Sequence, residues 1–308
     1  MAHVSALDAA HVNKKSSKAK VAKYASFLAF KAAHGFCATN ADSVSAFLVL
    51  HVQKCRSAKS VRSVLSQLRT LHAELQLSFL SKNDELIVRR RVEALEYDDA
   101  SATRRVIALP LRTIQAFTRS LDLRKTDERC VAICINLGHN GLLRGIEATR
   151  RNTQQDPGAI VADFDISTDK SSLAYSIDRT KTSRRGPPIK VCIPAIAPKG
   201  QWDAVSLVDL HLNTNNLGSN PSAPFFPPYV TTSWLRSWMK KLAKLHGINP
   251  SLVGNHCLRA GGATDLFRTD LPSWAIKKYG RWSSDAALLY QRDELDIWAR
   301  VKAGFQQL

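Results

Sequence analysis

The chain has 308 residues, enough for one large domain or two ordinary ones. Its 44 Lys and Arg against 26 Asp and Glu leave a formal charge of +18, while 44% of its residues are hydrophobic. That hydrophobic content supports packed cores and excludes a disordered basic tail. The charge favours a polyanionic partner, either a nucleic acid or an acidic membrane surface.

Several other classes of protein are excluded by what the sequence lacks. No run approaches the roughly 18 apolar residues of a membrane span, and Met1 to Lys15 lacks the layout of a signal peptide. Cys130 and Cys134 have no second Cys/His pair at zinc-ligand spacing. No Gly-rich phosphate loop and no H-E-x-x-H motif occurs. We therefore expect no metal, no cofactor and no membrane-spanning segment, and cysteines that are small buried residues in a reducing compartment.

The first part of the chain predicts a basic helical bundle. Residues 1–72 carry half of the excess charge, +9, and hydrophobic periodicity predicts helices over 19–33, 43–53 and 60–75. In the third of these the apolar residues share one face and the cations fall elsewhere. This pattern fits either a solvated bundle or, as we favour, a bundle whose basic face grips phosphates. The candidate phosphate-binding residues are Lys54, Arg56, Lys59, Arg62 and Arg69.

The rest of the chain predicts a second domain of mixed structure. A polar stretch without apolar periodicity, 99–108, separates a first domain, 1–98, from a second, 109–308. The second begins with a helix at Pro110 and a strongly apolar helix over 130–143. The strands that we expect are 160–166, 172–177 and 189–193, followed by a helix over 201–212, a loop over 213–229 and further helices from Thr232. The fold class is therefore mainly α: a helical bundle plus a mixed α+β domain with a small antiparallel sheet.

Two short segments of this second domain could carry chemistry. Arg144, in GLLRGIE, follows the apolar helix and precedes Glu147 by three residues, which is also the spacing of an ordinary helix-surface pair. Lys181, in DRTKTSRRG, lies between two predicted strands. A turn lysine is normally only solvated, but Arg184 and Arg185 beside it make a phosphate-binding patch plausible.

The segment from 255 onward combines several unusual features. Asn255 can cap a helix on which His256 and Arg259, three residues apart, share a face. Gly261 and Gly262 lie inside that helix, where each costs about 1 kcal/mol relative to Ala. We therefore expect some other part of the chain to approach this backbone closely.

Four more residues complete the pattern. Gly280 is predicted to end the next helix, Trp282 follows in a loop, and Ser284 caps a helix that carries Tyr290. Each of these side chains alone is most simply a packing residue. Together with His256 and Arg259 they form a set that packing does not explain.

The order H-x-x-R, then G-R-W, then Tyr resembles the tyrosine recombinase (phage integrase) family. GLLRGIE looks like that family's first active-site arginine, here Arg144, with Glu147 as the accompanying acid, and Lys181 matches the lysine of its β-hairpin. The segments HCLRAGGATD and GRWSSDAALLY look most like those of the recombinases of eukaryotic mobile elements of the Crypton and DIRS types. The basic bundle is similar in placement to the family's core-binding domain. Two departures are the eight-residue spacing from Trp282 to Tyr290, one shorter than in many bacterial members, and the 213–229 loop, which has no obvious counterpart.

The resemblance implies a site-specific recombinase or integrase that cleaves and rejoins double-stranded DNA through a 3′-phosphotyrosine, moving a mobile element without a metal or cofactor. The expected catalytic residues are Arg144, Lys181, His256, Arg259, Trp282 and the nucleophile Tyr290, with Glu147 in support and Arg184 and Arg185 on DNA. It also implies a tetramer on DNA held by the C-terminal helix, with no membrane partner. A eukaryotic mobile element would place the protein in the nucleus, and any other origin would place it in the cytoplasm or nucleoid. The alternatives are a type IB topoisomerase and a domesticated, non-catalytic DNA-binding protein.

Overall fold

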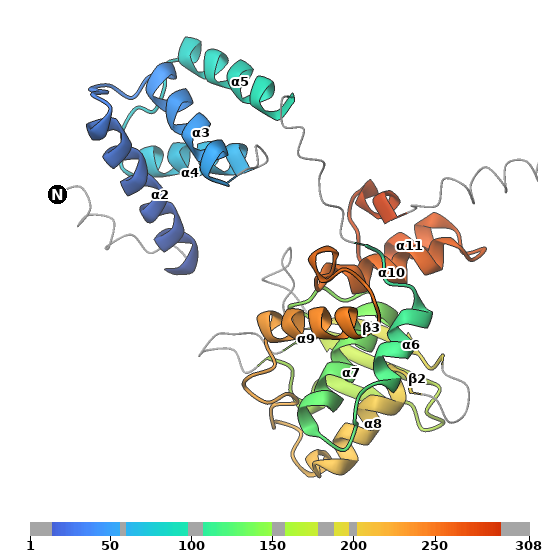
Figure 1. Cartoon of the computed structure of the whole chain (residues 1–308). Helices are drawn as coiled ribbons and strands as arrows, with labels where there is room; N and C mark the ends of the chain where they lie inside the picture. The colour runs from blue at the N-terminus through green and yellow to red at the C-terminus, as the bar shows by residue number, and fades with distance from the viewer. Residues whose placement is uncertain are drawn as a thin grey trace, which may run out of the picture. The chain divides into compact units, whose positions relative to one another are not determined.

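The structure, a computed structural model, describes residues 14–55, 60–97, 107–149, 158–177, 188–196 and 202–290. The chain divides into two compact units, 1–104 and 105–308 (Figure 1). The division falls inside the 99–108 stretch that the sequence suggests as a linker. In the described part of the chain, no helix is long and apolar enough to cross a membrane.

The described part of the first unit is helical. Its helices are α2 (Lys14–Ala33), α3 (Ala41–Cys55), α4 (Val61–Glu74) and α5 (Lys82–Tyr97). The core contains Phe27, Val44 and Leu68, none of which is exposed. Helix α5 is not predicted from the sequence because it is polar along most of its length. Only a narrow stripe, including Val88 and Val92 at helical spacing, is buried.

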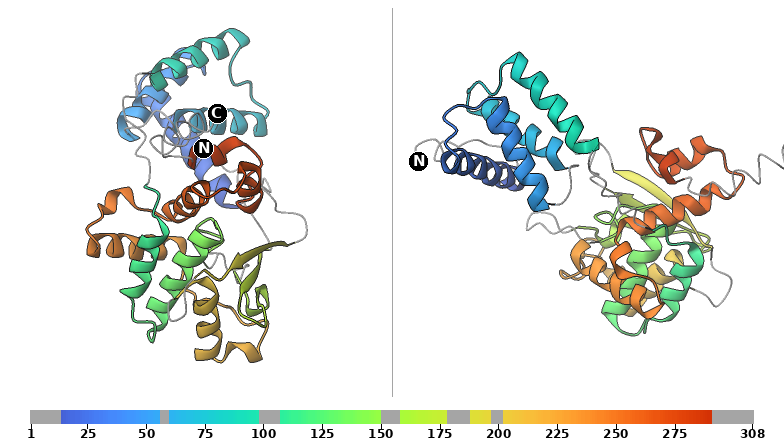
Figure 2. Two further views of the ribbon diagram at one scale, coloured as in Figure 1. Left: turned by 90° about the vertical axis from the view of Figure 1, so that its right-hand side faces the viewer. Right: turned by 45° about the horizontal axis from the view of Figure 1, so that its top comes forward.

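The second unit is built around one buried helix. The elements are α6 (Leu111–Arg119), α7 (Thr126–Asn140), α8 (Ala204–Thr214), α9 (Thr232–Leu245), α10 (His256–Phe267), α11 (Ser273–Tyr279) and the 3-10 helix η6 (Asp285–Tyr290). Helix α7 is buried on every face from Arg129 to His139, because α6, α8, α9, α10 and the sheet all pack against it (Figure 2).

A small antiparallel sheet in the order β1-β2-β3 completes this unit. Its strands are β1 (Phe164–Ile166), β2 (Ser172–Ile177) and β3 (Ile189–Pro194). The predicted fold class, mainly α with a small antiparallel sheet, is confirmed. The first strand is shorter than the predicted 160–166, because a 3-10 turn, η3 (Val161–Asp163), takes its beginning. The Asp163 carboxylate accepts a hydrogen bond from the Ile160 N–H at 2.8 Å and stabilises that turn.

The glycine pair of α10 lies where two other backbones touch the helix. A Cβ on Gly261 would stand 1.8 Å from the Leu109 carbonyl oxygen, and one on Gly262 would stand 2.1 Å from that of His139. The expected close approach is therefore confirmed. Asn255 does precede α10, but the prediction that its side chain caps the helix is wrong. Its Nδ2 instead donates to the Thr232 carbonyl at 2.7 Å, which ties the start of α10 to the start of α9.

The 213–229 loop is fastened to the core. Phe225 and Phe226 are buried, and buried His211 hydrogen-bonds the Phe225 carbonyl through Nε2 at 3.0 Å. Arg129, also buried, donates Nε to His211 Nδ1 at 3.3 Å and Nη2 to the Asn215 side chain at 3.2 Å. Burial, helped by the charge of Arg129 and opposed by the bond to Phe225, lowers the pKa of His211 to about 4. A neutral His211 is thus part of what holds the loop.

The cysteines only partly follow expectation. Cys130, Cys134 and Cys257 are buried, and burial raises the pKa of the Cys130 thiol to about 12. Cys37 and Cys192 are exposed, so the prediction of uniformly buried cysteines is wrong for these two. Cys37 follows the turn after α2, and Cys192 alternates with buried Val191 and Ile193 on β3, so it lies on the exposed face of that strand.

Candidate active site

The first part of the candidate site is the turn that follows α7. Arg144 Nη1 donates to Glu147 Oε1 at 2.8 Å, and the Arg144 N–H donates to Oε2 at 2.9 Å. The Glu147 side chain is fully buried, whereas that of Arg144 is 27% exposed. The pairing predicted from GLLRGIE therefore exists, and of the two side chains the arginine is the one that faces outward.

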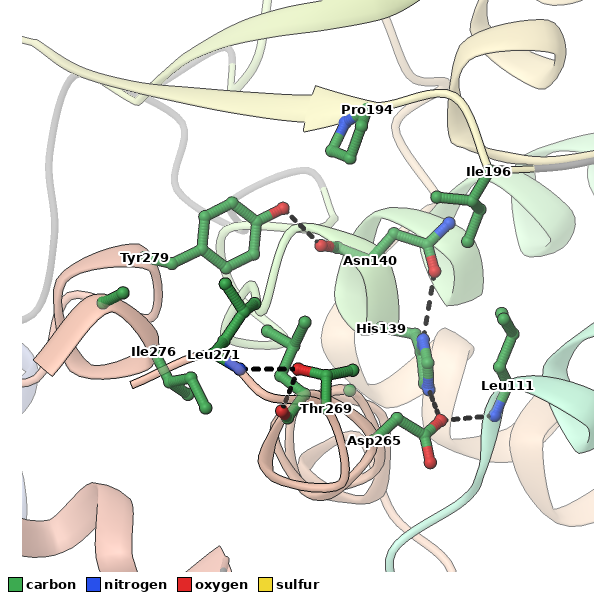
Figure 3. A pocket seen from close by; sticks show the side chains of 13 residues that line it. Leu111, His139, Asn140, Pro194, Ile196, Asp265, Thr269, Leu271, Ile276 and Tyr279 are labelled. Atoms are coloured by element: carbon green, nitrogen blue, oxygen red, sulfur yellow. Dashed lines mark hydrogen bonds and ion pairs between the residues drawn. The ribbon is translucent and has the colours of Figure 1, made fainter. Parts of the chain in front are cut away.

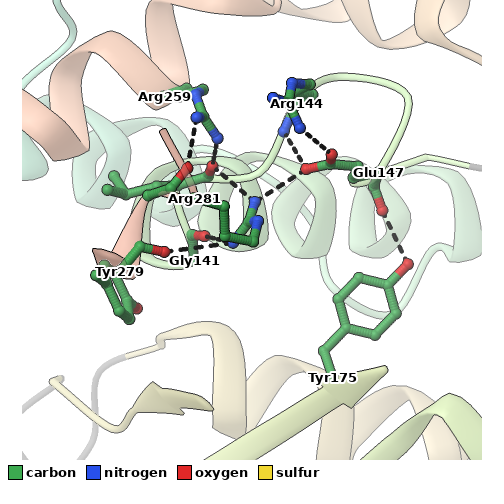
Figure 4. A network of polar contacts seen from close by, with 9 residues as sticks. Gly141, Arg144, Glu147, Tyr175, Arg259, Tyr279 and Arg281 are labelled. Atoms are coloured by element: carbon green, nitrogen blue, oxygen red, sulfur yellow. Dashed lines mark hydrogen bonds and ion pairs between the residues drawn. The ribbon is translucent and has the colours of Figure 1, made fainter. Parts of the chain in front are cut away.

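Glu147 has a second cationic partner. Arg281 Nη2 donates to Glu147 Oε2 at 3.0 Å, and the Glu147 backbone carbonyl accepts from the Tyr175 hydroxyl at 2.9 Å (Figure 4). Burial alone would raise the pKa of the Glu147 carboxyl. The hydrogen bond from the Arg144 N–H and the charges of Arg281 and Arg144 outweigh it and lower that pKa. Glu147 is therefore a buried carboxylate, held ionised by two arginines.

Arg259 lies on α10 with its guanidinium inside the molecule. Its Nη1 donates to the Leu142 carbonyl and its Nη2 to the Gly280 carbonyl at 2.6 Å. The guanidinium carbon stands 4.1 Å from the ring centroid of Trp282, a cation–π stack. Burial, and then the charges of Arg144 and Arg281, lower the pKa of Arg259 to about 10. It remains a cation at neutral pH.

The second part of the site joins a tyrosine to a histidine. The Tyr290 hydroxyl lies 2.7 Å from His256 Nε2, and the Tyr290 carbonyl accepts from Thr264 Oγ1 at 2.9 Å. Trp282 packs beside Tyr290 with ring centroids 5.4 Å apart. The tyrosine is 8% exposed. Because Trp282 contacts both Arg259 and Tyr290, it links the two parts into one site.

Five predicted catalytic residues thus lie in one connected cluster: Arg144, His256, Arg259, Trp282 and Tyr290, with Glu147. The three guanidinium groups of Arg144, Arg259 and Arg281 face a single carboxylate, a formal excess of two positive charges. Chemically this arrangement offers a binding site for an anion beside a hydroxyl nucleophile that has a base within hydrogen-bond reach. Lys181, Arg184 and Arg185 lie outside the described residues, as do Arg56 and Lys59.

Arg281 is absent from the sequence-based prediction. The only local signal is its place between the two motif residues Gly280 and Trp282. An arginine there looks like an exposed loop residue until the packing shows that its side chain is only 12% exposed.

The candidate phosphate-binding residues of the first unit have acidic partners. Arg62 forms two hydrogen bonds with Glu96, at 2.6 and 2.5 Å, and Arg69 pairs with Glu85 at 3.1 Å. Both acids come from α5, the helix that the sequence did not predict. Lys54 is exposed on α3. Carboxylates of α5 therefore pair with two arginines of the predicted basic face. The role of this face in binding DNA phosphates stays a prediction.

A separate apolar pocket of about 560 Å³ lies between α10, α11 and the end of β3 (Figure 3). Its walls include Leu266, Leu271 and Ile276. At its base, His139 Nε2 stands 3.2 Å from Asp265 Oδ2. Burial would raise the pKa of Asp265, but the hydrogen bonds from His139 and from the Leu111 N–H lower it.

No protein-family model matches the sequence, and no curated protein matches it by sequence. Solved structures do match its fold. The XerH site-specific recombinase, in a post-cleavage complex with palindromic difH substrate, is 13% identical, with a TM-score of 0.59 over 86% of this chain and 71% of that chain. The Tn1549 transposon integrase in complex with transposon right-end DNA is 11% identical, with a TM-score of 0.59 over 98% of this chain and 96% of that one.

A lambda integrase dimer bound to a core site is 16% identical, with a TM-score of 0.57 over 95% of this chain and 93% of that one. At such identities the likeness establishes the fold alone. The resemblance to tyrosine recombinases is thereby confirmed at the level of the fold. The particular likeness to eukaryotic mobile elements stays a prediction.

Proposed function

We propose that this chain, which has the fold of the tyrosine recombinases, is a site-specific recombinase that cleaves and rejoins duplex DNA through Tyr290. The observation that carries the proposal is the Tyr290 hydroxyl, 2.7 Å from His256 Nε2, inside a cluster with Arg144 and Arg259. A nucleophile, a base and an excess of positive charge are the three elements that attack on a phosphodiester requires.

The proposed step forms one bond and breaks another. The Tyr290 oxygen attacks the scissile phosphorus while His256 Nε2 takes the hydroxyl proton. The bond from phosphorus to the 5′ oxygen breaks, leaving the phosphate attached to Tyr290 at the 3′ end of the cut strand. Lys181, assigned from the family resemblance, supplies a proton to the departing 5′ oxygen. Attack by a 5′ hydroxyl reverses the sequence and rejoins the strand, so the phosphodiester energy is retained in the protein–DNA link.

The arginines neutralise the charge that builds on the non-bridging oxygens. Arg144 is the more exposed, and its planar fork suits a phosphate. Arg259 is fixed by two backbone carbonyls and by the Trp282 ring, so its remaining N–H donors have a defined direction. A donor set that is held in place before the substrate arrives costs little reorganisation during the reaction.

The proposal extends to assembly and to the biological role. Both units would contact DNA, mostly through phosphates, and the reaction would move a mobile element in a nucleus.

Residues 291–308 lie outside the described residues, and their sequence holds apolar side chains typical of an amphipathic helix. We propose that this segment joins neighbouring protomers into a tetramer on DNA, with the apolar pocket beside α11 as its receptor. Removal of 291–308 should then leave DNA binding by the monomer intact and abolish the tetrameric complex in analytical ultracentrifugation.

A suicide substrate, nicked beside the cleavage site, tests the central step. Incubated with the ends of its own element, the wild-type chain should form a covalent adduct that survives denaturing electrophoresis, and peptide mapping should place the DNA on Tyr290. Tyr290→Phe should form none. Tyr229→Phe, which alters an exposed tyrosine of the same unit, is the matched control and should react normally. An absence of adduct with the wild type would refute the enzymatic proposal.

The two alternatives give different outcomes in the same system. A type IB topoisomerase would relax supercoiled DNA as a monomer without exchanging strands between two sites. A domesticated DNA-binding protein would bind DNA equally well with and without the Tyr290 hydroxyl and would form no adduct at all. Strand exchange between two labelled duplexes, abolished by Tyr290→Phe, is the result expected of a recombinase.

A further inference from the structure

Arg281 occupies a backbone position that ordinarily belongs to glycine. Helix α11 ends in a pair of bonds in which the Trp282 N–H donates to the Lys277 carbonyl at 3.0 Å and the Arg281 N–H to that of Lys278 at 3.1 Å. This is the pattern of the Schellman motif, whose left-handed residue is usually glycine. Here the left-handed residue, with a φ of +58°, is Arg281. An L-residue is strained in that region, and the contacts of the Arg281 side chain have to offset that strain.

The glycine that the motif favours stands one position earlier, for a different reason. A Cβ on Gly280 would lie 1.6 Å from the Trp282 ring, so the tryptophan requires a glycine there. The G-R-W sequence thus combines two separate features. Gly280 leaves space for the Trp282 ring, and Arg281 has an unfavourable backbone conformation.

The Arg281 side chain spans from α11 to the turn that carries Arg144. Its Nη2 donates to Glu147 Oε2 at 3.0 Å and to the Leu142 carbonyl at 3.2 Å, and its Nη1 lies 3.3 Å from the Gly141 carbonyl. The same Leu142 carbonyl accepts from Arg259. Arg281 therefore touches the partners of both proposed phosphate ligands, Arg144 and Arg259, and is less exposed than Arg144.

The charges explain what this contact does. Glu147 is fully buried and carries a negative charge, and its cationic partners are Arg144 and Arg281. A phosphate that binds Arg144 competes with Glu147 for the same guanidinium. With Arg281 in place, Glu147 keeps a buried counter-charge while Arg144 turns outward. Without Arg281, Arg144 would be the sole counter-charge of a buried carboxylate, which is costly to leave unpaired.

We propose that Arg281 is a positioning residue that compensates Glu147 and fixes the 141–147 turn, so that Arg144 is free to bind the scissile phosphate. This proposal rests on the proposed recombinase function, because the phosphate is the ligand for which Arg144 is released. Arg281 itself would not touch the DNA. Its influence on cleavage would pass through Glu147 and Arg144.

The first experiment measures single-turnover cleavage of the suicide substrate at saturating DNA, together with the dissociation constant for DNA. Arg281→Ala should cleave about 30-fold or more slowly, while its dissociation constant stays within about threefold of the wild type. Arg124→Ala is the matched control, because Arg124 is an exposed arginine of the same unit that also pairs with a carboxylate, Asp122. It should cleave at the wild-type rate. Cleavage by Arg281→Ala within about threefold of the wild type would overturn the proposal.

The second experiment separates positioning through Glu147 from a general structural effect. Removing the carboxylate charge removes the competitor of the phosphate, so Glu147→Gln combined with Arg281→Ala should cleave at least about tenfold faster than Arg281→Ala alone. If the two substitutions instead multiply their separate losses, Arg281 does not act through Glu147.

A third variant decides the question if Arg281→Ala does not fold. Arg281→Lys keeps a charge beside Glu147 but loses the planar fork that reaches Leu142 at the same time. It should fold and cleave about tenfold more slowly than the wild type. Full activity in Arg281→Lys would show that charge alone suffices and would overturn the role of the fork. Failure of the proposed function is distinguished from all these results, because the wild type would then form no adduct.

Discussion

Two arginines of the first unit and two of the second are held in opposite ways. In the first unit, Arg62 and Arg69 are more than half exposed, with 64% and 53% of each side chain open to solvent, and they pair with carboxylates of α5. In the second unit, Arg259 and Arg281 are buried and donate mainly to backbone carbonyls. The same residue type thus forms exchangeable surface pairs at Arg62 and Arg69 and fixed internal ties at Arg259 and Arg281. The second unit also has exposed pairs, such as Arg124 with Asp122.

The difference teaches where each unit tolerates change. An exposed ion pair contributes little to stability, because water and salt screen it, and its arginine can exchange a carboxylate for a phosphate. A buried guanidinium has paid a large desolvation cost and depends on each of its acceptors, so its removal leaves polar groups unsatisfied. We therefore expect large, position-specific effects in the second unit and small, charge-dependent effects in the first.

The largest effect is expected at Arg259. Arg259→Ala removes the fork, its stack on Trp282 and the donors to Leu142 and Gly280, so cleavage of the suicide substrate should fall at least about 10³-fold. The dissociation constant for DNA should rise by less than about tenfold, because phosphate contacts spread over both units supply most of the affinity. Arg268→Ala, at the end of the same helix, should retain cleavage. An equal loss of cleavage and binding would instead identify Arg259 as a structural residue.

The next largest effect concerns the packing that brings the second unit's arginines together. Gly261→Ala would force a methyl group against the Leu109 carbonyl, and a backbone group cannot easily move aside. We therefore expect a loss of about 3 kcal/mol or more in the free energy of unfolding. Urea denaturation followed by tryptophan fluorescence reports on this unit, since all six tryptophans lie after residue 201. Gly218→Ala is the control, because nothing lies within 4 Å of its added Cβ. Equal stability of the two variants would contradict the packing described for α10.

A smaller effect is expected at His211, whose pKa is lowered to about 4. The pKa of His211 in the unfolded chain is about 6.5, so between pH 6.5 and pH 4 His211 is protonated in the unfolded chain and neutral in the folded one. The contribution of His211 to the free energy of unfolding is therefore fully present above pH 6.5 and is lost as the pH falls towards 4. Between pH 7.5 and pH 5 the loss should be about 2 kcal/mol.

His211→Gln keeps a donor to the Phe225 carbonyl but does not titrate, so most of this pH dependence should disappear from its urea midpoints. His246→Gln, which changes an exposed histidine of the same unit, should retain it. A wild-type midpoint that does not move between pH 7.5 and pH 5 would mean that His211 is protonated in the folded protein.

The smallest effects are expected in the first unit. Arg62→Ala and Arg69→Ala should each reduce the slope of log affinity against log salt by about 0.9, the loss of one phosphate contact. Cleavage of DNA that is already bound should not change. Arg91→Ala removes a similar exposed arginine, paired with Asp42, that is not among the predicted contacts, and its slope should match the wild type. Unchanged slopes for Arg62 and Arg69 would place the DNA-binding face elsewhere on the bundle.

Sequence patterns alone were enough to place His256 and Arg259 on one helix, to end a helix at Gly280 and to anticipate a close approach at Gly261. They also predicted a small sheet and most of the helices. These features depend on residues that are neighbours along the chain, where periodicity, capping and the conformational cost of glycine leave direct signs. Helix α5 was not predicted, because a helix with a narrow buried stripe shows little hydrophobic periodicity.

Tertiary structure alone decided the long-range pairings. The hydrogen bond from Tyr290 to His256, the stack of Arg259 on Trp282 and the tie from Arg281 to Glu147 each join residues from different elements. The acidic partners of Arg62 and Arg69 likewise come from another helix. Which buried charge meets which acceptor depends on how the elements pack, and a pattern within one element carries no record of that. The sequence therefore named the chemical groups, and the packing determined which of them act on one another.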